Sequence, residues 1–352
     1  NMFEGLRSLD SLDLLRNQID TIENEAFIEL DKLKSLNMES NRLRSIENIQ
    51  IEKLHPIRSI VLNKNPLLKF GSSATCVNNK IKSFGFFINL NNLSLNNLSS
   101  FGCFNKLDTL SLDNNEIKML GEQKAYEIHL IDIRQLNELS MNHLNIESFK
   151  FFSLKSNDLR VKSLSLSYNS IDTLENVTFF GLNHLTELYL DNNRIEIIDN
   201  VNLNGVEMLL KLDLTSNQIK YINQSHFRGI QKLKILVLAK NSIESITNIH
   251  LSGLDQLELL DLHTNQIKSA ESVHFYGASN LLVLILTGNK IGSIENCSFF
   301  NLKHLKRLYM DENSLKSVRN VSFKGLDDLA LFDLSKNRIK VDSNHLTFTG
   351  LN

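Results

Sequence analysis

Hydrophobic and polar positions follow one short pattern that returns along most of the chain. The pattern reads L-x-x-L-x-L-x-x-N-x-I, as in residues 185–195, where the asparagine is Asn193 and the last apolar residue is Ile195. Apolar residues at every second position predict a short strand with one buried face. The asparagine after it predicts a turn. We therefore expect short parallel strands that stack beside one another.

The pattern recurs at a spacing of 24 residues, which decides the architecture. In the regular region, residues 161–352, the asparagines in register are Asn169, Asn193, Asn217, Asn241, Asn265, Asn289, Asn313 and Asn337. The same place is taken earlier by Asn17, Asn41, Asn65 and Asn115, and twice by leucine, at Leu98 and Leu144. The spacing is irregular between residues 66 and 160. We predict a single solenoid over residues 1–352 with about fourteen repeats.

Each element of the repeat has a physical role. A buried asparagine can satisfy backbone groups of its own coil and of the next, so one per coil predicts a continuous amide ladder. A phenylalanine ten residues later fills the wide half of the coil, at Phe27, Phe179, Phe227, Phe275, Phe299 and Phe323. Two residues after that position a glycine permits the turn back, at Gly181, Gly205, Gly229, Gly253, Gly277 and Gly325.

These residues resemble the 24-residue typical class of leucine-rich repeat, found in Toll-like receptor ectodomains, in chaoptin and in other animal adhesion and guidance proteins. The resemblance implies an α/β solenoid, a right-handed horseshoe with a parallel β-sheet on its concave face and loops or short helical turns on its convex face. Such proteins usually close their ends with cysteine-rich caps, and neither is visible here. We therefore expect an uncapped fragment of a longer ectodomain.

Charge and motifs exclude several classes of function. The net charge of -2 provides no broad cationic field, so no nucleic acid partner is expected. The longest apolar run, Leu281 to Leu286, is too short to span a bilayer, so membrane contact would come only through segments outside this chain. No nucleotide-binding, metalloprotease or serine hydrolase motif is present. We expect no enzyme activity, no catalytic residues, no cofactor and no metal site.

The cysteines leave two readings open. Cys76 and Cys103 lie in the irregular region, where a disulfide could pin a long loop to the solenoid. Two buried free thiols are the alternative, and the resemblance to extracellular proteins favours the bridge. Cys297 has no partner in the sequence and is expected to be packed.

Sites for N-linked glycans occur at six asparagines. Asn176, Asn296 and Asn320 share one register, seven residues after the ladder asparagine, where a glycan would lie on the convex side. The remaining sites are Asn92, Asn97 and Asn223, of which the first two lie in or beside a strand.

Three histidines lie one period apart, at His226, His250 and His274. They are expected to stack as a column on adjacent coils, where mutual repulsion could make the column a sensor of acidity. The alternative is a hydrogen-bonded face with no further role. A metal site is disfavoured, because no carboxylate or thiolate recurs in the same column.

One block of outward strand positions is apolar: Ile235, Val237, Leu259, Val283 and Ile285. Two tyrosines flank it in the same column, Tyr189 and Tyr309, and tyrosine is a common interface anchor. We interpret these residues as a candidate ligand-binding surface. The alternative is that single exposed aliphatic residues are ordinary and carry no function.

The resemblance and the patch together predict a non-enzymatic, extracellular or cell-surface recognition module. Its partner would be a protein ligand, a microbial ligand or a co-receptor, with a homodimer or heterodimer as a further possibility. The leading hypothesis is part of a receptor for Toll-like immune or developmental signalling. The alternatives are a chaoptin-like adhesion or guidance protein and an intracellular scaffold.

Overall fold

A computed structural model describes most of the regular region and parts of the rest. The described residues are 3–49, 54, 56–62, 64–66, 87–89, 109–113, 125–130, 133, 135–155, 159–222, 225–246, 249–270, 273–294, 299–300, 302–316, 321–322, 326–340 and 348–349. Two compact units can be distinguished, and each is described by itself. Unit 1 comprises residues 1–169 and 179–185, and unit 2 comprises residues 170–178 and 186–352.

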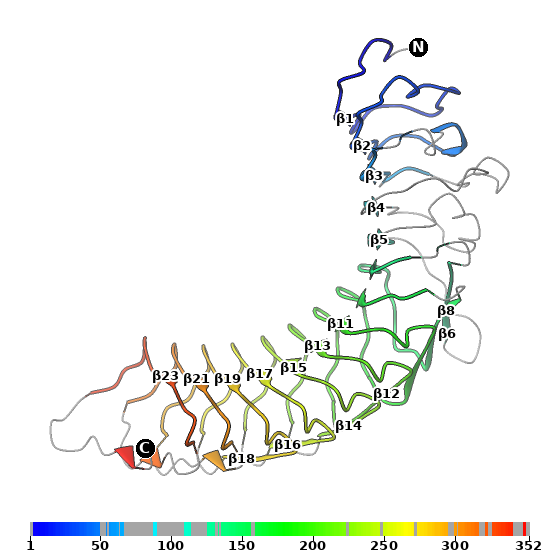
Figure 1. Ribbon diagram of the computed structural model, residues 1–352. Coiled ribbons are helices and arrows are strands. Elements are labelled where there is room, and N and C mark those ends of the chain that lie inside the picture. The colour runs from blue at the N-terminus through cyan, green and yellow to red at the C-terminus, as the bar shows by residue number, and fades with distance from the viewer. Residues whose placement is uncertain are drawn as a thin grey trace. The chain divides into compact units, whose positions relative to one another are not determined.

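Most L-x-L segments form short parallel strands that stack side by side, as the alternation predicted (Figure 1). The strand expected at Leu93–Leu95, before Leu98, is an exception, because the strand of that repeat is Phe87–Asn89. We call this layer the major sheet. In unit 1 its strands are, in order, β1 (Ser11–Asp13), β2 (Ser35–Asn37), β3 (Ser59–Val61), β4 (Phe87–Asn89), β5 (Thr109–Ser111), β7 (Glu138–Ser140) and β9 (Ser163–Ser165). In unit 2 they are β11 (Glu187–Tyr189), β13 (Lys211–Asp213), β15 (Ile235–Val237), β17 (Leu259–Asp261), β19 (Val283–Ile285), β21 (Arg307–Tyr309) and β23 (Leu331–Asp333).

A second layer of short parallel strands, which we call the minor sheet, lies where loops or helical turns were expected. Unit 1 contributes β6 (Ala125–His129) and β8 (Phe151–Lys155), and unit 2 contributes β12 (Asn200–Asn204), β14 (Ser225–Arg228), β16 (Ile249–Ser252), β18 (Val273–Tyr276) and β20 (Phe299–Phe300). Two residues of β10 (Val177–Phe180), Val177 and Thr178, pair with β12. A separate pair joins β22 (Val321–Ser322) to β24 (Phe348–Thr349).

Helix is nearly absent from the described part of the chain, where only η1 (Glu47–Ile49) is helical. The α/β label therefore fits poorly, and a parallel-strand solenoid is the better description. The reason is visible in the sequence around the phenylalanine position. Apolar residues alternate there too, as in Val201 and Leu203 or Ile249 and Leu251, and this period of two favours strand over helix.

The two sheets differ in register. In the major sheet Leu212 lies opposite Leu236, so partners are separated by the 24 residues of the repeat. In the minor sheet Val201 lies opposite Phe227, a separation of 26 residues. In unit 2, neighbouring coils are therefore in step along the major sheet and offset by two residues along the minor sheet.

The core of each unit lies between these layers and is made of the repeated apolar residues. In unit 2 the central strand residues Leu212, Leu236 and Leu260 are fully buried. The aromatic positions Phe227 and Phe275 are buried to 1% exposure. In unit 1, Phe149, Phe152 and Phe179 form a cluster whose ring centroids lie 5.8 to 6.0 Å apart. Phe179, Phe227 and Phe275 are buried at positions that the repeat spacing predicted, and Phe149 and Phe152 add to the core of unit 1.

The ladder asparagines join each coil to the one before it. The side-chain amide of Asn217 donates to the carbonyl oxygens of Leu190 and Leu214, both at 3.0 Å. Its carbonyl oxygen accepts from the backbone N–H of Ile195, at 3.0 Å. Contacts of the same kind are made by Asn41, Asn65, Asn169, Asn193, Asn241, Asn265, Asn289, Asn313 and Asn337.

A glycine turn closes the minor-sheet half of the coil. Gly229 has a φ of 81°, in the left-handed region. A Cβ atom placed on it would clash with the carbonyl oxygen of Leu203 in the neighbouring coil. Only a residue without a side chain fits a position that is both left-handed and in contact with backbone.

We predict that Asn217→Ala destabilises unit 2 by about 1 to 3 kcal/mol, because buried N–H and C=O groups lose their partners. Gln218→Ala, at the exposed neighbouring position, should change the free energy of unfolding by less than about 0.5 kcal/mol. Denaturant unfolding measures the difference, and amide hydrogen exchange at Ile195 shows whether it is local. Equal stability of the two variants would contradict the ladder.

We predict that Gly229→Ala costs at least about 2 kcal/mol, since the new methyl group meets the Leu203 carbonyl and the backbone is left-handed. The control is Gly292→Ala, because a Cβ atom there has nothing within 4 Å. Thermal unfolding of both variants compares them. A Gly292 variant that is as unstable as the Gly229 variant would show that the close approach is not the cause.

Candidate recognition surface

The outward positions of the major sheet in unit 2 form two columns, one for each end of the three-residue strands. The first column runs through Lys211, Ile235, Leu259, Val283 and Arg307, which are successive cross-strand partners. Three adjacent apolar side chains are thus bracketed by two cations. The apolar residues are half-buried, with one side toward their neighbours and one toward solvent.

The second column runs through Asp213, Val237, Asp261, Ile285 and Tyr309. Here apolar residues alternate with carboxylates, so Val237 and Ile285 lie on either side of Asp261. The candidate patch of the sequence analysis is therefore continuous along the first column and interrupted in the second.

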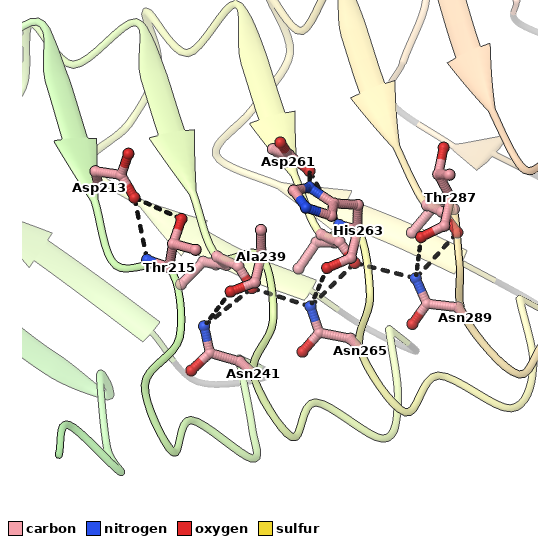
Figure 2. A network of polar contacts seen from close by, with 12 residues as sticks. Asp213, Thr215, Ala239, Asn241, Asp261, His263, Asn265, Thr287 and Asn289 are labelled. Atoms are coloured by element: carbon pink, nitrogen blue, oxygen red, sulfur yellow. Dashed lines mark hydrogen bonds and ion pairs between the residues drawn. The ribbon is translucent and has the colours of Figure 1, made fainter. Parts of the chain in front are cut away.

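The carboxylates of this column fasten the turns at the strand ends (Figure 2). Asp213 accepts from the backbone N–H and the hydroxyl of Thr215, at 3.1 and 2.6 Å. Asp261 accepts from the backbone N–H of His263 at 2.9 Å and lies 2.8 Å from its Nδ1. These contacts fix the conformation of the turn that follows each of these two strands of the major sheet.

The same fastening recurs in the last strand of the major sheet. Asp333 accepts from Ser335, and the pKa of its carboxyl lies below its ordinary value. The main cause is the backbone N–H of Ser335, followed by that residue's hydroxyl. The turn thus favours the ionised carboxylate.

Tyr189 lies in the same column, next to Asp213. Its hydroxyl donates to Glu187 at 2.8 Å. The ammonium group of Lys211 lies 3.3 Å from the tyrosine oxygen and 4.4 Å from the ring centroid. Tyr189 is therefore a partly fixed aromatic side chain at one end of the patch, while Tyr309 lies opposite Ile285 at the other end.

The expected histidine column is wrong. Because the minor sheet pairs residues 26 apart, His226 lies opposite Ser252 and His250 lies opposite Tyr276. The rings of His250 and Tyr276 stack with centroids 4.5 Å apart. The backbone partner of His274 is Phe300. The three histidines are therefore not cross-strand partners of one another, as the column required.

Of the predicted glycan sites only Asn176 lies among the described residues. It is exposed, directly precedes β10, and its side-chain oxygen accepts from Asn202 at 3.0 Å. The other predicted residues lie outside the described part of the chain: Asn92, Asn97, Asn223, Asn296, Asn320, Cys76, Cys103 and Cys297.

Sequence reasoning overlooked the two cations that bracket the apolar patch. Lys211 and Arg307 stand at the same offset from their ladder asparagines as Ile235 does from Asn241, so the 24-residue spacing carried the signal. Within the described residues, no group of three potential metal ligands gathers, and no helix has the length and apolar character needed to cross a membrane.

Comparison with known proteins identifies the repeat. A family model described as leucine rich repeat matches residues 1–43, 134–195, 159–219, 207–267, 256–315, 279–339 and 303–352. A search among curated proteins found no significant match.

Several solved structures are similar. The leucine-rich repeat domain of APL1B is 19% identical, with a TM-score of 0.51 over 90% of this chain and 86% of that chain. The APL1 leucine-rich repeat domain is also 19% identical, with a TM-score of 0.50 over 90% and 76%. An internalin from Listeria monocytogenes is 18% identical, with a TM-score of 0.45 over 96% and 83%. At this level of identity the likeness concerns the fold alone.

Proposed function

Because the chain belongs to the leucine-rich repeat family, whose members are generally non-enzymatic binding modules, we propose that its major sheet is a protein-recognition surface. The observation that carries the proposal is the row of Ile235, Leu259 and Val283 on adjacent strands, solvent-facing and bracketed by Lys211 and Arg307. Contiguous apolar side chains with a polar rim are typical of protein contact sites.

Three features favour a protein partner over a small molecule. The surface is a row of outward strand positions fixed by backbone pairing, and an extended row of this kind suits a second protein surface. The aspartates of the second column already bond to their own turns, so the patch is rigid before a partner arrives. Tyr189 and Tyr309 supply aromatic side chains at the two ends of the patch.

The finer proposal is an extracellular receptor module, with a chaoptin-like adhesion protein and an intracellular scaffold as alternatives. Its support is the regular 24-residue spacing and the ladder asparagines, together with the exposed glycan acceptor sequence at Asn176. The horseshoe bend, the count of about fourteen repeats and dimerisation belong to this proposal. The lack of enzyme activity and of a nucleic acid ligand stay predictions.

The patch is tested with a photo-crosslinking residue at Leu259, and with the same residue at Ile197 as control, in the full chain. Ile197 is 66% exposed and lies outside the major sheet. We expect a protein to be captured from the native source at Leu259 only, and mass spectrometry identifies it. Capture at both positions alike would contradict the surface.

With the captured protein purified, Ile235→Asp combined with Val283→Asp should weaken its binding at least about tenfold, because new charges enter the apolar row. The matched control combines Ile197→Asp with Met208→Asp, which adds the same charge at exposed apolar positions elsewhere. Calorimetry compares the dissociation constants. Unaltered binding by the first double variant would exclude the patch.

The extracellular part of the proposal has its own test. Protein purified from its native source should carry a glycan at Asn176, detected by mass spectrometry before and after enzymatic removal. Thr178→Ala, which destroys the acceptor sequence, should abolish that glycan in recombinant secreted protein. An unmodified Asn176 in the native protein would favour the intracellular alternative.

A further inference from the structure

A run of cations lies on the turns that follow the ladder asparagines in unit 2. Its members stand one or three residues after the asparagine of four successive coils: Lys268, Lys290, Lys316, Arg338 and Lys340. All five are exposed. We call them the basic strip. The net charge of the whole chain is only -2, so the strip is a local concentration of positive charge.

Backbone hydrogen bonds between coils place these residues in two parallel rows. In one row Gly292 donates to Lys268 at 3.2 Å, Lys316 donates to Gly292 at 3.4 Å, and Lys340 donates to Lys316 at 3.2 Å. In the other row, the backbone N–H of Lys290 donates to the carbonyl oxygen of Ile267, and that of Arg338 donates to the carbonyl oxygen of Leu315, both at 2.9 Å.

This ladder sets the spacing of the charges. Hydrogen-bonded strands lie about 5 Å apart, so four coils carry the charges over a length of about 15 Å.

Among the described residues, only one cation of the strip has an anionic partner. Lys268 forms an ion pair with Glu244 at 3.0 Å. No acidic side chain lies within ion-pair distance of Lys290, Lys316, Arg338 or Lys340 in the part of the chain that the structure describes. These four side chains are exposed, so an external anion can reach them.

The surface between the cations is open and polar. Gly292 lies in the middle of one row, and a Cβ atom on it would meet nothing within 4 Å. The other positions in the two rows are Gln266 and Ser314. Neither row contains an aromatic or aliphatic residue, which is unlike the major-sheet patch of the same unit.

This composition selects among polyanions. Proteins that bind single-stranded nucleic acid stack its bases on aromatic side chains, and the rows offer none. A protein partner would need an apolar or aromatic anchor at the centre of the contact, and the rows lack that as well. A linear chain with anionic groups at regular intervals needs only a matching row of cations. We propose that the basic strip binds a linear sulfated polysaccharide along the axis of the stacked coils.

The full chain tests this with a heparin oligosaccharide of defined length as probe, measured by calorimetry at about 0.15 M salt. The strip variant combines Lys290→Gln, Lys316→Gln and Lys340→Gln. Each lost surface ion pair weakens binding a few-fold, so the dissociation constant should rise about tenfold or more. The dependence of affinity on salt should become shallower at the same time, because fewer counterions are released.

A matched control removes the same charge elsewhere in unit 2 through Lys232→Gln, Lys303→Gln and Lys306→Gln, all at exposed positions. It should bind within about twofold of the unaltered protein. The desulfated oligosaccharide should not bind.

Four results would overturn the proposal. The first is that the unaltered protein does not bind the heparin oligosaccharide, and the second is that both triple variants lose affinity equally. The third is that the desulfated oligosaccharide binds equally well. The fourth is that a single-stranded RNA of the same length binds more tightly than heparin and that this binding is abolished in the strip variant. The last result would assign the strip to nucleic acid instead.

Discussion

The structure depends on one constraint, which is that every coil must satisfy backbone groups of its neighbour. Strand pairing does this for the major sheet, and the ladder asparagines do it at the turn that follows. Asn265 shows the geometry: its amide reaches Leu238 and Leu262 in two coils, and its oxygen accepts from Ile243. Because these groups are buried, slippage by one residue would leave them unpaired at a cost of about 1 to 3 kcal/mol each. The register is therefore fixed by chemistry that recurs once per coil.

Because the register is fixed, residues at the same place in successive repeats line up as columns on the surface. Residues 24 apart become neighbours along the major sheet, so a property shared by three successive repeats becomes a surface patch. Ile235, Leu259 and Val283 produce an apolar row in this way, and Lys316 and Lys340 produce a basic one. These outward positions contribute little to the core, whose buried leucines are the residues between them. The surface can therefore vary while the fold is kept.

Much of this organisation could be predicted from the sequence, because it depends on contacts at the repeat spacing. The strands, the asparagine ladder and the left-handed glycines all follow from one period. The register of the minor sheet did not follow, because its offset between coils is two residues larger than the repeat, as the pairing of Val201 with Phe227 shows. No count along the sequence reveals such an offset. The same offset separates His226 from His250, which periodicity alone had placed side by side.

Within the repeat, the residues of the apolar patch precede the ladder asparagine in the sequence, and the residues of the basic strip follow it. In the coil of Asn265, Leu259 and Asp261 precede the asparagine on the strand, and Lys268 follows it on the turn. Asn265 bonds to Leu262 at the end of its own strand and to Ile243 on the turn of the preceding coil, and Asn289 bonds in the same way to Ile267, on the turn that carries Lys268. Loss of a ladder amide should therefore disturb both surfaces together, whereas a change at an outward position should affect only the surface that carries it. A substitution at a ladder position should therefore lower stability, whereas a substitution at an outward position should change only binding.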